Sequence, residues 1–280
     1  MSATAQPSFR LSRTHTRTIS FTSGKGGVGK STLLANVSVA LAGQGHQVLI
    51  LDGDMGMANI YVMFGIRTTH NIQHVLTGER ELKDIIVEAS PGVHLIPGGS
   101  GVYGLHNLSI FQKKALLDQV SALQGPYDFM LIDTASGIDD TVLYLNAAAQ
   151  ETFVVVTPEP ASLTDAYALI KVMHKKFSES RFSIVTNMVQ DEAEALGIFK
   201  KLSDVTSRFL CVSLDYKGFI PNDQNLRIAT KSQQLVTLVE PRAAASYAIR
   251  MLAEKLNGYS PMAQAKGGMQ FFWEQLIGVA

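Results

Sequence analysis

A glycine-rich segment near the start of the chain has the composition and spacing of a phosphate-binding loop. Residues 24–31 read Gly-Lys-Gly-Gly-Val-Gly-Lys-Ser and fit the pattern G-x-x-x-x-G-K-[ST]. Glycines let successive backbone N–H groups face phosphate oxygens, and the positive end of the following helix adds to that attraction. We predict that Lys30 reaches the terminal phosphates of a nucleoside triphosphate and that Ser31 holds Mg²⁺. The predicted nucleotide-binding residues of this loop are Gly24, Lys25, Gly26, Gly27, Val28, Gly29, Lys30, Ser31 and Thr32.

Three aspartates follow apolar runs and are placed to complete a magnesium site. Asp52 and Asp54 come after the run 48–51, and Asp133 comes after 129–132. Carboxylates beside a phosphate loop can bind Mg²⁺ directly or through water, and they can orient an attacking water. We therefore predict metal contacts from Ser31, Asp54 and Asp133, and a catalytic role for Lys30, Asp52 and Asp54. The alternative is that the aspartates only cap the elements that follow them.

Short apolar runs alternate with longer helical patterns, which indicates βαβ units. Runs that are apolar throughout are typical of strands buried on both faces. The predicted fold is α/β: a mostly parallel twisted sheet of about seven or eight strands with helices on both faces. Ligands of such sheets bind at the carboxyl ends of the strands. Strands are expected at 18–22, 47–51, 93–96, 129–132, 153–157, 182–186 and 210–214, and helices at 30–43, 109–123, 140–149, 162–177, 192–206, 222–232 and 241–257.

Composition excludes several classes of protein. The chain has 280 residues, a net charge of zero and one cysteine. One cysteine excludes an intramolecular disulfide and a multi-thiolate metal site, and we expect Cys211 to be a small apolar residue in a buried strand. No apolar run approaches the ~20 residues of a membrane span. Balanced charge makes direct nucleic-acid binding driven by bulk charge unlikely, although the stretch before Asp52 contains basic residues and no acid.

The two ends of the chain suggest separate segments. Residues 1–17 are rich in Ser and Thr and are predicted to be a disordered leader. Residues 259–268 are a predicted hinge before a short amphipathic helix over 269–278. Its apolar residues share one helical face, which either docks on a membrane or partner or packs permanently on the core. They are Met269, Phe272, Trp273, Leu276 and Ile277. A separate pair, His70 and His74, has helical metal-ligand spacing, but a solvated or capping role fits it better because no third ligand is evident.

Lys25, directly after the first glycine, makes the loop resemble the deviant phosphate loop of the MinD/ParA ATPases, a group of P-loop NTPases. The resemblance implies a P-loop ATPase domain over 18–258, with ATP and Mg²⁺ as cofactors. It also implies that Lys25 contacts the partner subunit's nucleotide in an ATP-dependent homodimer, and so acts in catalysis. Residues 51–59 and 131–137 resemble the two switch segments of the family, which gives Asp54 the role of positioning the hydrolytic water. Asn187, Pro221 and Asp223 match the family's adenine pocket.

Residues 157–171 and 218–223 resemble the flagellar-number regulators of this family. The resemblance implies slow, regulatory ATP hydrolysis in the bacterial cytoplasm, with peripheral association with the inner membrane or cell pole through the tail helix. The implied partners are a flagellar transcriptional activator, an FlhF-type GTPase and flagellar switch proteins. Residues 1–17 contain no Asp-Gln-Ala motif, so the resemblance does not extend to GTPase stimulation by this segment. The alternatives are a division-site or chromosome/plasmid positioning ATPase of the same superfamily, and a metabolic P-loop enzyme.

Overall fold

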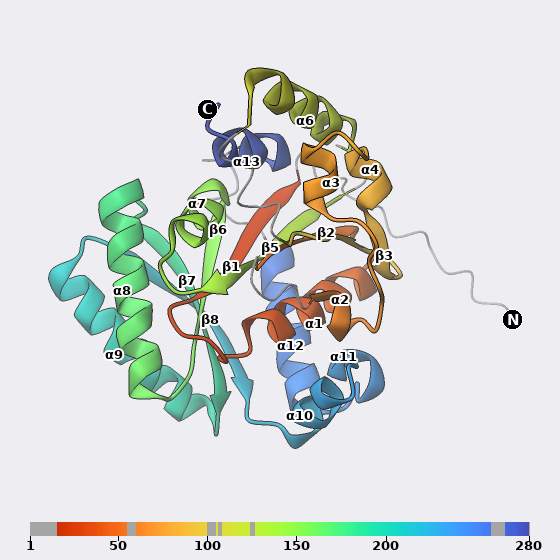
Figure 1. The fold of residues 1–280 in the computed structure, drawn as a ribbon. Helices are drawn as coiled ribbons and strands as arrows, with labels where there is room; N and C mark the ends of the chain where they lie inside the picture. The colour runs from red at the N-terminus through yellow and green to blue at the C-terminus, as the bar shows by residue number, and fades with distance from the viewer. Residues whose placement is uncertain are drawn as a thin grey trace, which may run out of the picture.

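The computed structural model describes residues 16–54, 60–99, 105, 108–123, 127–258 and 267–279. Within these ranges an eight-stranded sheet has the order β3-β4-β2-β5-β1-β6-β7-β8 (Figure 1). Neighbouring strands pair in parallel, except that β3 pairs antiparallel with β4. The predicted α/β class is confirmed. The strands are β1 (Arg17–Ser23), β2 (Val48–Gly53), β3 (Val87–Ser90), β4 (Val93–Ile96), β5 (Phe129–Ser136), β6 (Glu151–Val156), β7 (Arg181–Val189) and β8 (Ser213–Pro221).

Helices cover both faces of the sheet (Figure 1). The first face packs on α1 (Lys30–Gly43), α2 (Ile60–Met63), α11 (Val236–Val239) and α12 (Ala244–Asn257). The second face packs on α3 (Ile72–Leu76), α4 (Leu82–Ile85), α6 (Ile110–Ala122) and α13 (Met269–Leu276). Over the β6–β7 end, that face packs on α7 (Asp140–Ala148), α8 (Pro160–Phe177) and α9 (Glu192–Phe209). The remaining helix of the described ranges, α10 (Gln224–Lys231), follows β8.

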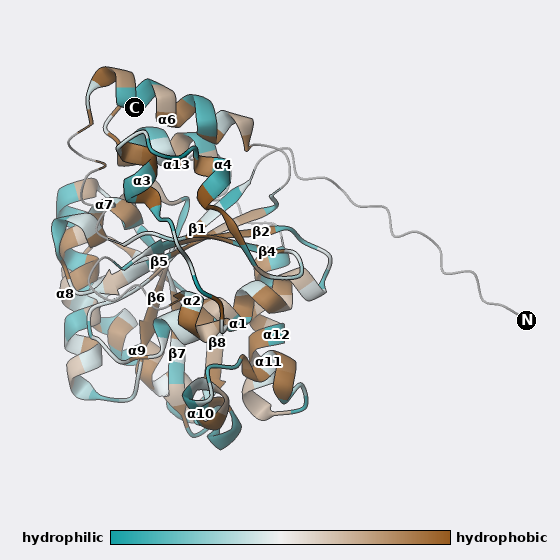
Figure 2. Ribbon diagram, turned by 45° about the vertical axis from the view of Figure 1, so that its right-hand side comes forward, coloured by the Kyte–Doolittle hydropathy of each residue, from teal (hydrophilic) through white to brown (hydrophobic). Residues whose placement is uncertain are grey.

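The central strands are buried on both faces, and this explains their uninterrupted apolar sequences. Every residue of β1, β2 and β6 is buried. Along β2, Val48 and Ile50 belong to the apolar cluster of the first face, whereas Leu49 and Leu51 belong to that of the second. Figure 2 shows hydrophobic strands between helices whose outer sides are mixed. Because parallel strands all run the same way, the loops after β1, β2 and β5 meet at one edge of the sheet.

The predicted strand at 210–214 was misplaced. Helix α9 continues to Phe209, and β8 begins only at Ser213. Cys211 is exposed between them, so the expectation of a buried cysteine in a strand was wrong. Both β8 and the unpredicted β3 are edge strands in which most residues are partly buried or exposed, and Ile220 is the one buried residue of the two. A strand that borders water on one side does not need the continuous apolar run by which the central strands were found.

The leader boundary also differs from the prediction. Thr16 and Arg17 are buried, and Arg17 is the first residue of β1, so they do not belong to a leader. The rest of the predicted leader, residues 1–15, lies outside the described residues, as does most of the predicted hinge, 259–266. In the described residues no helix is long and apolar enough to span a membrane.

A buried ion pair joins the start of β1 to the start of β6. The Nε of Arg17 donates to Oε1 of Glu151 at 2.6 Å, and both side chains are at most 4% exposed. The same guanidinium donates through Nη1 to the carbonyl oxygens of Leu256 and Gly258 at the end of α12. One cation therefore neutralises a buried acid and satisfies carbonyl groups that the helix end leaves open.

We predict that Arg17→Met destabilises the fold by about 3 kcal/mol or more, because it leaves the carboxylate of Glu151 buried without its cation. Urea denaturation of the purified protein measures this change in the free energy of unfolding. The double variant Arg17→Met with Glu151→Met is the control, and it should recover most of the loss. Equal stability of the single and double variants would contradict the role given to the ion pair.

Candidate functional site

The glycine loop connects β1 to α1 and has the backbone shape that phosphate binding requires. Gly27 and Gly29 have φ values of 78° and 83°, in the left-handed region that favours glycine. A Cβ on Gly29 would lie 2.5 Å from Nδ2 of Asn187. A Cβ on Gly24 would lie 2.2 Å from the backbone carbon of Asp165 in α8. Close packing against β7 and α8 thus fixes the loop and excludes side chains at these two positions.

Lys30 and Asp133 form a buried ion pair beneath the loop. The Nζ of Lys30 donates to Oδ1 of Asp133 at 2.8 Å and to Oγ of Ser31 at 3.2 Å. Lys30 is 7% exposed and Asp133 is 1% exposed. Burial raises the pKa of Asp133, and the nearby Lys30 ammonium opposes that rise. Lys30, Ser31 and Asp133, three of the four residues predicted at the terminal phosphates and the metal, therefore meet in space, and the fourth, Asp54, lines the cleft beside the loop.

Asp52 lies beside Asp133 because β2 and β5 pair with these two residues in register. Asp52 is fully buried, and its Oδ1 accepts a hydrogen bond from the backbone N–H of Asp54 at 3.2 Å. Its Oδ2 is buried with no hydrogen-bond partner among the described residues. Burial, and then the charge of Asp133, raise the pKa of Asp52 to about 7.

The donor set fits a divalent cation. An orphaned carboxylate oxygen, a second carboxylate and a hydroxyl beside a phosphate loop are hard oxygen ligands of the kind that Mg²⁺ takes. A cation would also remove the repulsion between Asp52 and Asp133. Within the described residues no group of three or more His, Cys, Asp or Glu side chains is placed so that it could hold a metal ion.

A cleft of about 650 Å³ extends from the loop across the carboxyl edge of the sheet. It brings together the glycine loop, Asp54, Asn187 and the segment 221–223, as the sequence predicted. Its volume is typical of pockets that hold small ligands. Part of the cleft wall was not predicted from the sequence, although the helical spacing on α10 could have revealed its share. The unpredicted lining residues are Ser23, Met63, Ser136, Met188, Leu226, Arg227, Thr230 and Lys231.

The predicted adenine-pocket residues also hold the site together. Asn187 donates from Nδ2 to the carbonyl of Val28 in the loop at 2.7 Å, and its Oδ1 accepts from the backbone N–H of Met188. Asp223 accepts from the backbone N–H groups of Asn225 and Ala245, at 2.7 and 2.9 Å. It therefore caps α10 and binds near the start of α12. Asn187 fixes the loop, and Asp223 fixes the helix on the opposite side of the cleft.

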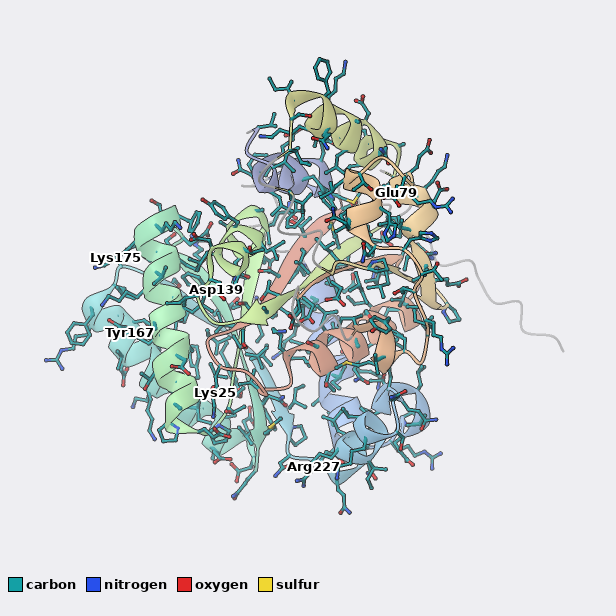
Figure 3. The ribbon with its side chains drawn as sticks, in the orientation of Figure 1. Lys25, Glu79, Asp139, Tyr167, Lys175 and Arg227 are labelled. Carbon is teal, nitrogen blue, oxygen red and sulfur yellow. The ribbon has the colours of Figure 1, made fainter. Side chains whose placement is uncertain are left out.

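Lys25 lies at the α8 side of the loop (Figure 3). Its ammonium forms an ion pair with Glu159, the residue directly before α8, and the two side chains are 35% and 62% exposed. The backbone of Lys25 is held separately, because Oγ of Ser23 donates to its carbonyl at 2.8 Å. The lysine thus points along the surface of its own subunit. Glu159 lies within residues 157–171, whose resemblance to the flagellar-number regulators implies no role for this residue.

The tail helix α13 packs on the core. Met269, Phe272, Trp273, Leu276 and Ile277 are all at most 2% exposed and belong to the cluster on the second face of the sheet. Oγ of Ser121 in α6 donates to Gln270 at 2.9 Å. Of the two predicted alternatives, packing on the core is the one that this structure has. A membrane or partner can contact this face only after α13 has left its groove.

Of the two histidines that have metal-ligand spacing, His74 caps a helix instead. His74 completes a capping box with Asn71 at the start of α3, and His70 lies before that helix. Their rings contact each other edge to face, with centroids 5.1 Å apart. The capping alternative is confirmed for His74.

Comparisons with known proteins agree with the geometry. A family model described as an AAA domain, AAA_31, matches residues 16–186. The chain is 39% identical to the antiactivator FleN of Pseudomonas aeruginosa over 259 residues, which cover 92% of each chain. It is 32% identical to the flagellum site-determining protein YlxH of Helicobacter pylori over 274 residues, covering 96% of this chain and 92% of the relative.

Solved structures of MinD proteins have the same fold. MinD in the MinC:MinD cell division complex of Aquifex aeolicus superposes with a TM-score of 0.71 at 26% identity, covering 87% of this chain and 97% of that one. MinD of Pyrococcus horikoshii complexed with Mg-ADP superposes with a TM-score of 0.68 at 28% identity, covering 89% and 98%.

We predict that Asp52→Asn stabilises the nucleotide-free protein at pH 7 by on the order of 2 kcal/mol. The pKa of Asp52 rises from 3.8 to about 7 on folding, so between these values only the folded chain keeps the proton. The free energy of unfolding therefore falls as the pH rises through this window. In Asp52→Asn the side chain does not titrate, so this part of the pH dependence of stability is absent. Urea denaturation from pH 4 to pH 8 without Mg²⁺ tests this, with the exposed Asp204→Asn as control. An unchanged slope in Asp52→Asn would show that the prediction is wrong.

The phosphate loop with its early lysine, the paired aspartates at the ends of β2 and β5, and the relatives all identify the same type of protein. The chain belongs to the MinD/ParA-type P-loop ATPases, which bind ATP with Mg²⁺ and hydrolyse it, and its sequence is similar to that of FleN.

Proposed function

We propose that the chain is an ATP-dependent dimerising ATPase that controls flagellar number or placement, with hydrolysis serving as a switch. The observation that carries this proposal is the similarity to FleN over 92% of both chains, at a level above that of the MinD relatives. YlxH, named as flagellum site-determining, supports the same assignment. Relatives named as septum site-determining support the alternative of division-site positioning only at the level of the superfamily.

The residues of the site divide the chemistry among them. Ser31, Asp54 and Asp133 remain the proposed magnesium ligands, and the orphaned oxygen of Asp52 beside Asp133 is a further candidate. Mg²⁺, when bound, would neutralise charge on the phosphates and orient them. The ammonium of Lys30, now compensated by Asp133, stabilises the negative charge that develops on the terminal phosphate. Asp54 lines the cleft beside the loop and is assigned the positioning of the attacking water. Asn187 holds the carbonyl of Val28 and so keeps the loop in shape before a nucleotide arrives.

Dimer formation requires Lys25 to change partners. In this structure Lys25 pairs with Glu159 of its own subunit, and in the proposed dimer it contacts the nucleotide of the partner subunit. The exposed ion pair contributes little to stability, at most about 1 kcal/mol, whereas a triphosphate offers a higher density of negative charge. ATP in both sites therefore favours the dimer, because the triphosphate is a better partner for Lys25 than Glu159 is. The monomer–dimer equilibrium shifts because ATP binds the two states with different affinity.

The dimer presents surfaces that the monomer lacks. We assign to it the recognition of a flagellar transcriptional activator, an FlhF-type GTPase or flagellar switch proteins. Localisation follows as cytoplasmic, with peripheral association with the inner membrane or cell pole. Because the apolar face of α13 is buried in the present state, membrane contact through the tail depends on its release, coupled to the nucleotide.

We predict that Glu159→Gln strengthens ATP-dependent dimerisation up to about fivefold, because Lys25 no longer has to leave a carboxylate. Lys25→Gln should prevent dimerisation while leaving ATP binding intact. Sedimentation velocity with and without ATP measures both effects. The matched control is Asp215→Asn, which removes another surface ion pair, with Lys217, on β8. A dimer that forms equally well with Lys25→Gln would contradict the proposed role of this lysine.

A deletion strain scored for flagellar number, division-site position and DNA segregation tests the biological assignment. We expect an abnormal flagellar number with normal division and segregation. Wild type should restore the number, Lys30→Ala should not, and Asp54→Ala should give a hyperactive regulator, because its ATP dimer would persist. Misplaced septa or lost chromosomes with a normal flagellar number would instead favour the positioning ATPases.

A further inference from the structure

The first turn of α6 exposes two large apolar side chains next to each other. Ile110 is 82% exposed and Phe111 is 87% exposed, the highest values for large apolar residues in the described part of the chain. Ser109 caps this end of the helix by accepting from the backbone N–H of Gln112. In Figure 1, α6 is the outermost helix above α13. The pair therefore lies on an outer helix with both side chains exposed, and burial in the fold does not explain it.

The opposite side of α6 already has its packing partners. Leu116 and Val120 are buried in the cluster that also contains the apolar face of α13. Neither Ile110 nor Phe111 belongs to any of the three core clusters of the described residues. The pair is consequently not needed to attach the helix to the sheet or to the tail.

Two lysines follow the pair on its own helix, whereas the neighbouring segment that faces Gln112 carries mixed charges. Its charged residues are Glu79, Arg80, Glu81, Lys83 and Asp84. Lys113 and Lys114 follow in the next positions, and the helix begins here, so the positive end of its dipole lies on the same side. The ammonium of Lys113 lies close to the end of the chain, 3.9 Å from where a Cβ on Gly278 would be. Asp118, the one acid of α6, lies about two turns further along.

We propose that Ile110, Phe111, Lys113 and Lys114 form a lipid-contact surface for anionic bilayers, which operates while the tail helix remains packed. Aromatic and aliphatic side chains that insert at the level of the headgroups, with lysines beside them, are the chemistry that binds such a surface. A stable protein interface needs about 800 Å² per partner, whereas a bilayer accepts a wedge of two side chains. The proposal deepens the membrane association proposed above and rests on it.

Each subunit provides only a small wedge, so binding is expected to be weak for the monomer and stronger for the ATP dimer, which presents two copies. This would place the protein at the membrane before the tail is released. The tail would then add a second apolar contact from the neighbouring element, since α6 and α13 pack together.

The test is co-sedimentation of the full chain with vesicles of phosphatidylglycerol and phosphatidylcholine, and with phosphatidylcholine alone. Ile110→Ser with Phe111→Ser should lower the partition coefficient at least about tenfold, because each buried methylene contributes about fourfold. Lys113→Gln with Lys114→Gln should remove the preference for the anionic vesicles. Helix α9 provides matched controls: Val205→Ser with Phe209→Ser, and Lys200→Gln with Lys201→Gln, all at exposed positions. Both control variants should bind like wild type.

Three outcomes would overturn the proposal. Unchanged vesicle binding by the Ile110 and Phe111 variant would show that lipid is contacted elsewhere. Equal losses in the α9 controls would show that general surface hydrophobicity or charge is responsible. Absence of vesicle binding by wild type, with loss of a protein partner in the α6 variants, would make this a protein-binding surface. ATPase activity and ATP-dependent dimerisation, measured on every variant, report separately on the proposed function, and all variants should retain both.

Discussion

The buried charge cluster of Lys30, Asp52 and Asp133 is the constraint around which the structure is organised. Two carboxylates lie side by side in a water-excluded position because β2 and β5 pair in register. Among the described residues, Lys30 is the one cation that forms an ion pair with either of them. The raised pKa of Asp52, to about 7, and its orphaned oxygen show that this arrangement is unfavourable by itself. A magnesium ion bound with a triphosphate would relieve it, because it would place positive charge beside the two carboxylates.

The same constraint explains why β1 is central. The strand that feeds the phosphate loop lies between β5, which carries Asp133, and β6, which leads to Glu159 and α8. At the opposite end of the sheet, Arg17 fixes the start of β1 to β6 and to the end of α12. β1 therefore lies next to three parts of the molecule: the phosphate loop, the strand that leads to Glu159, and the end of α12.

The proposed function requires two movements, the exchange of the partner of Lys25 and the release of α13, and the contacts that each must break differ in strength. Lys25 is held by an exposed ion pair, which is easily exchanged for a better anion. The face of α13 is fully buried, so its release costs the burial of several large side chains, including Phe272 and Trp273. The indole N–H of Trp273 has no hydrogen-bond partner among the described residues, which makes the packed state less favourable than burial alone suggests. The exposed tip of α6 requires no such release.

The sequence by itself determined the nucleotide chemistry and the central sheet. The glycine spacing with Lys30 and Ser31 is readable because phosphate binding uses backbone groups of one continuous segment, and buried parallel strands are apolar throughout. The edge strands β3 and β8 and the exposure of Cys211 were not readable, because half-buried segments have no distinctive pattern. Only the tertiary structure decided where the apolar face of the tail lies, since a protein core and a bilayer select the same spacing of apolar side chains. It also decided the partner of Lys25, because an ion pair between residues 134 positions apart depends on the fold and not on local sequence.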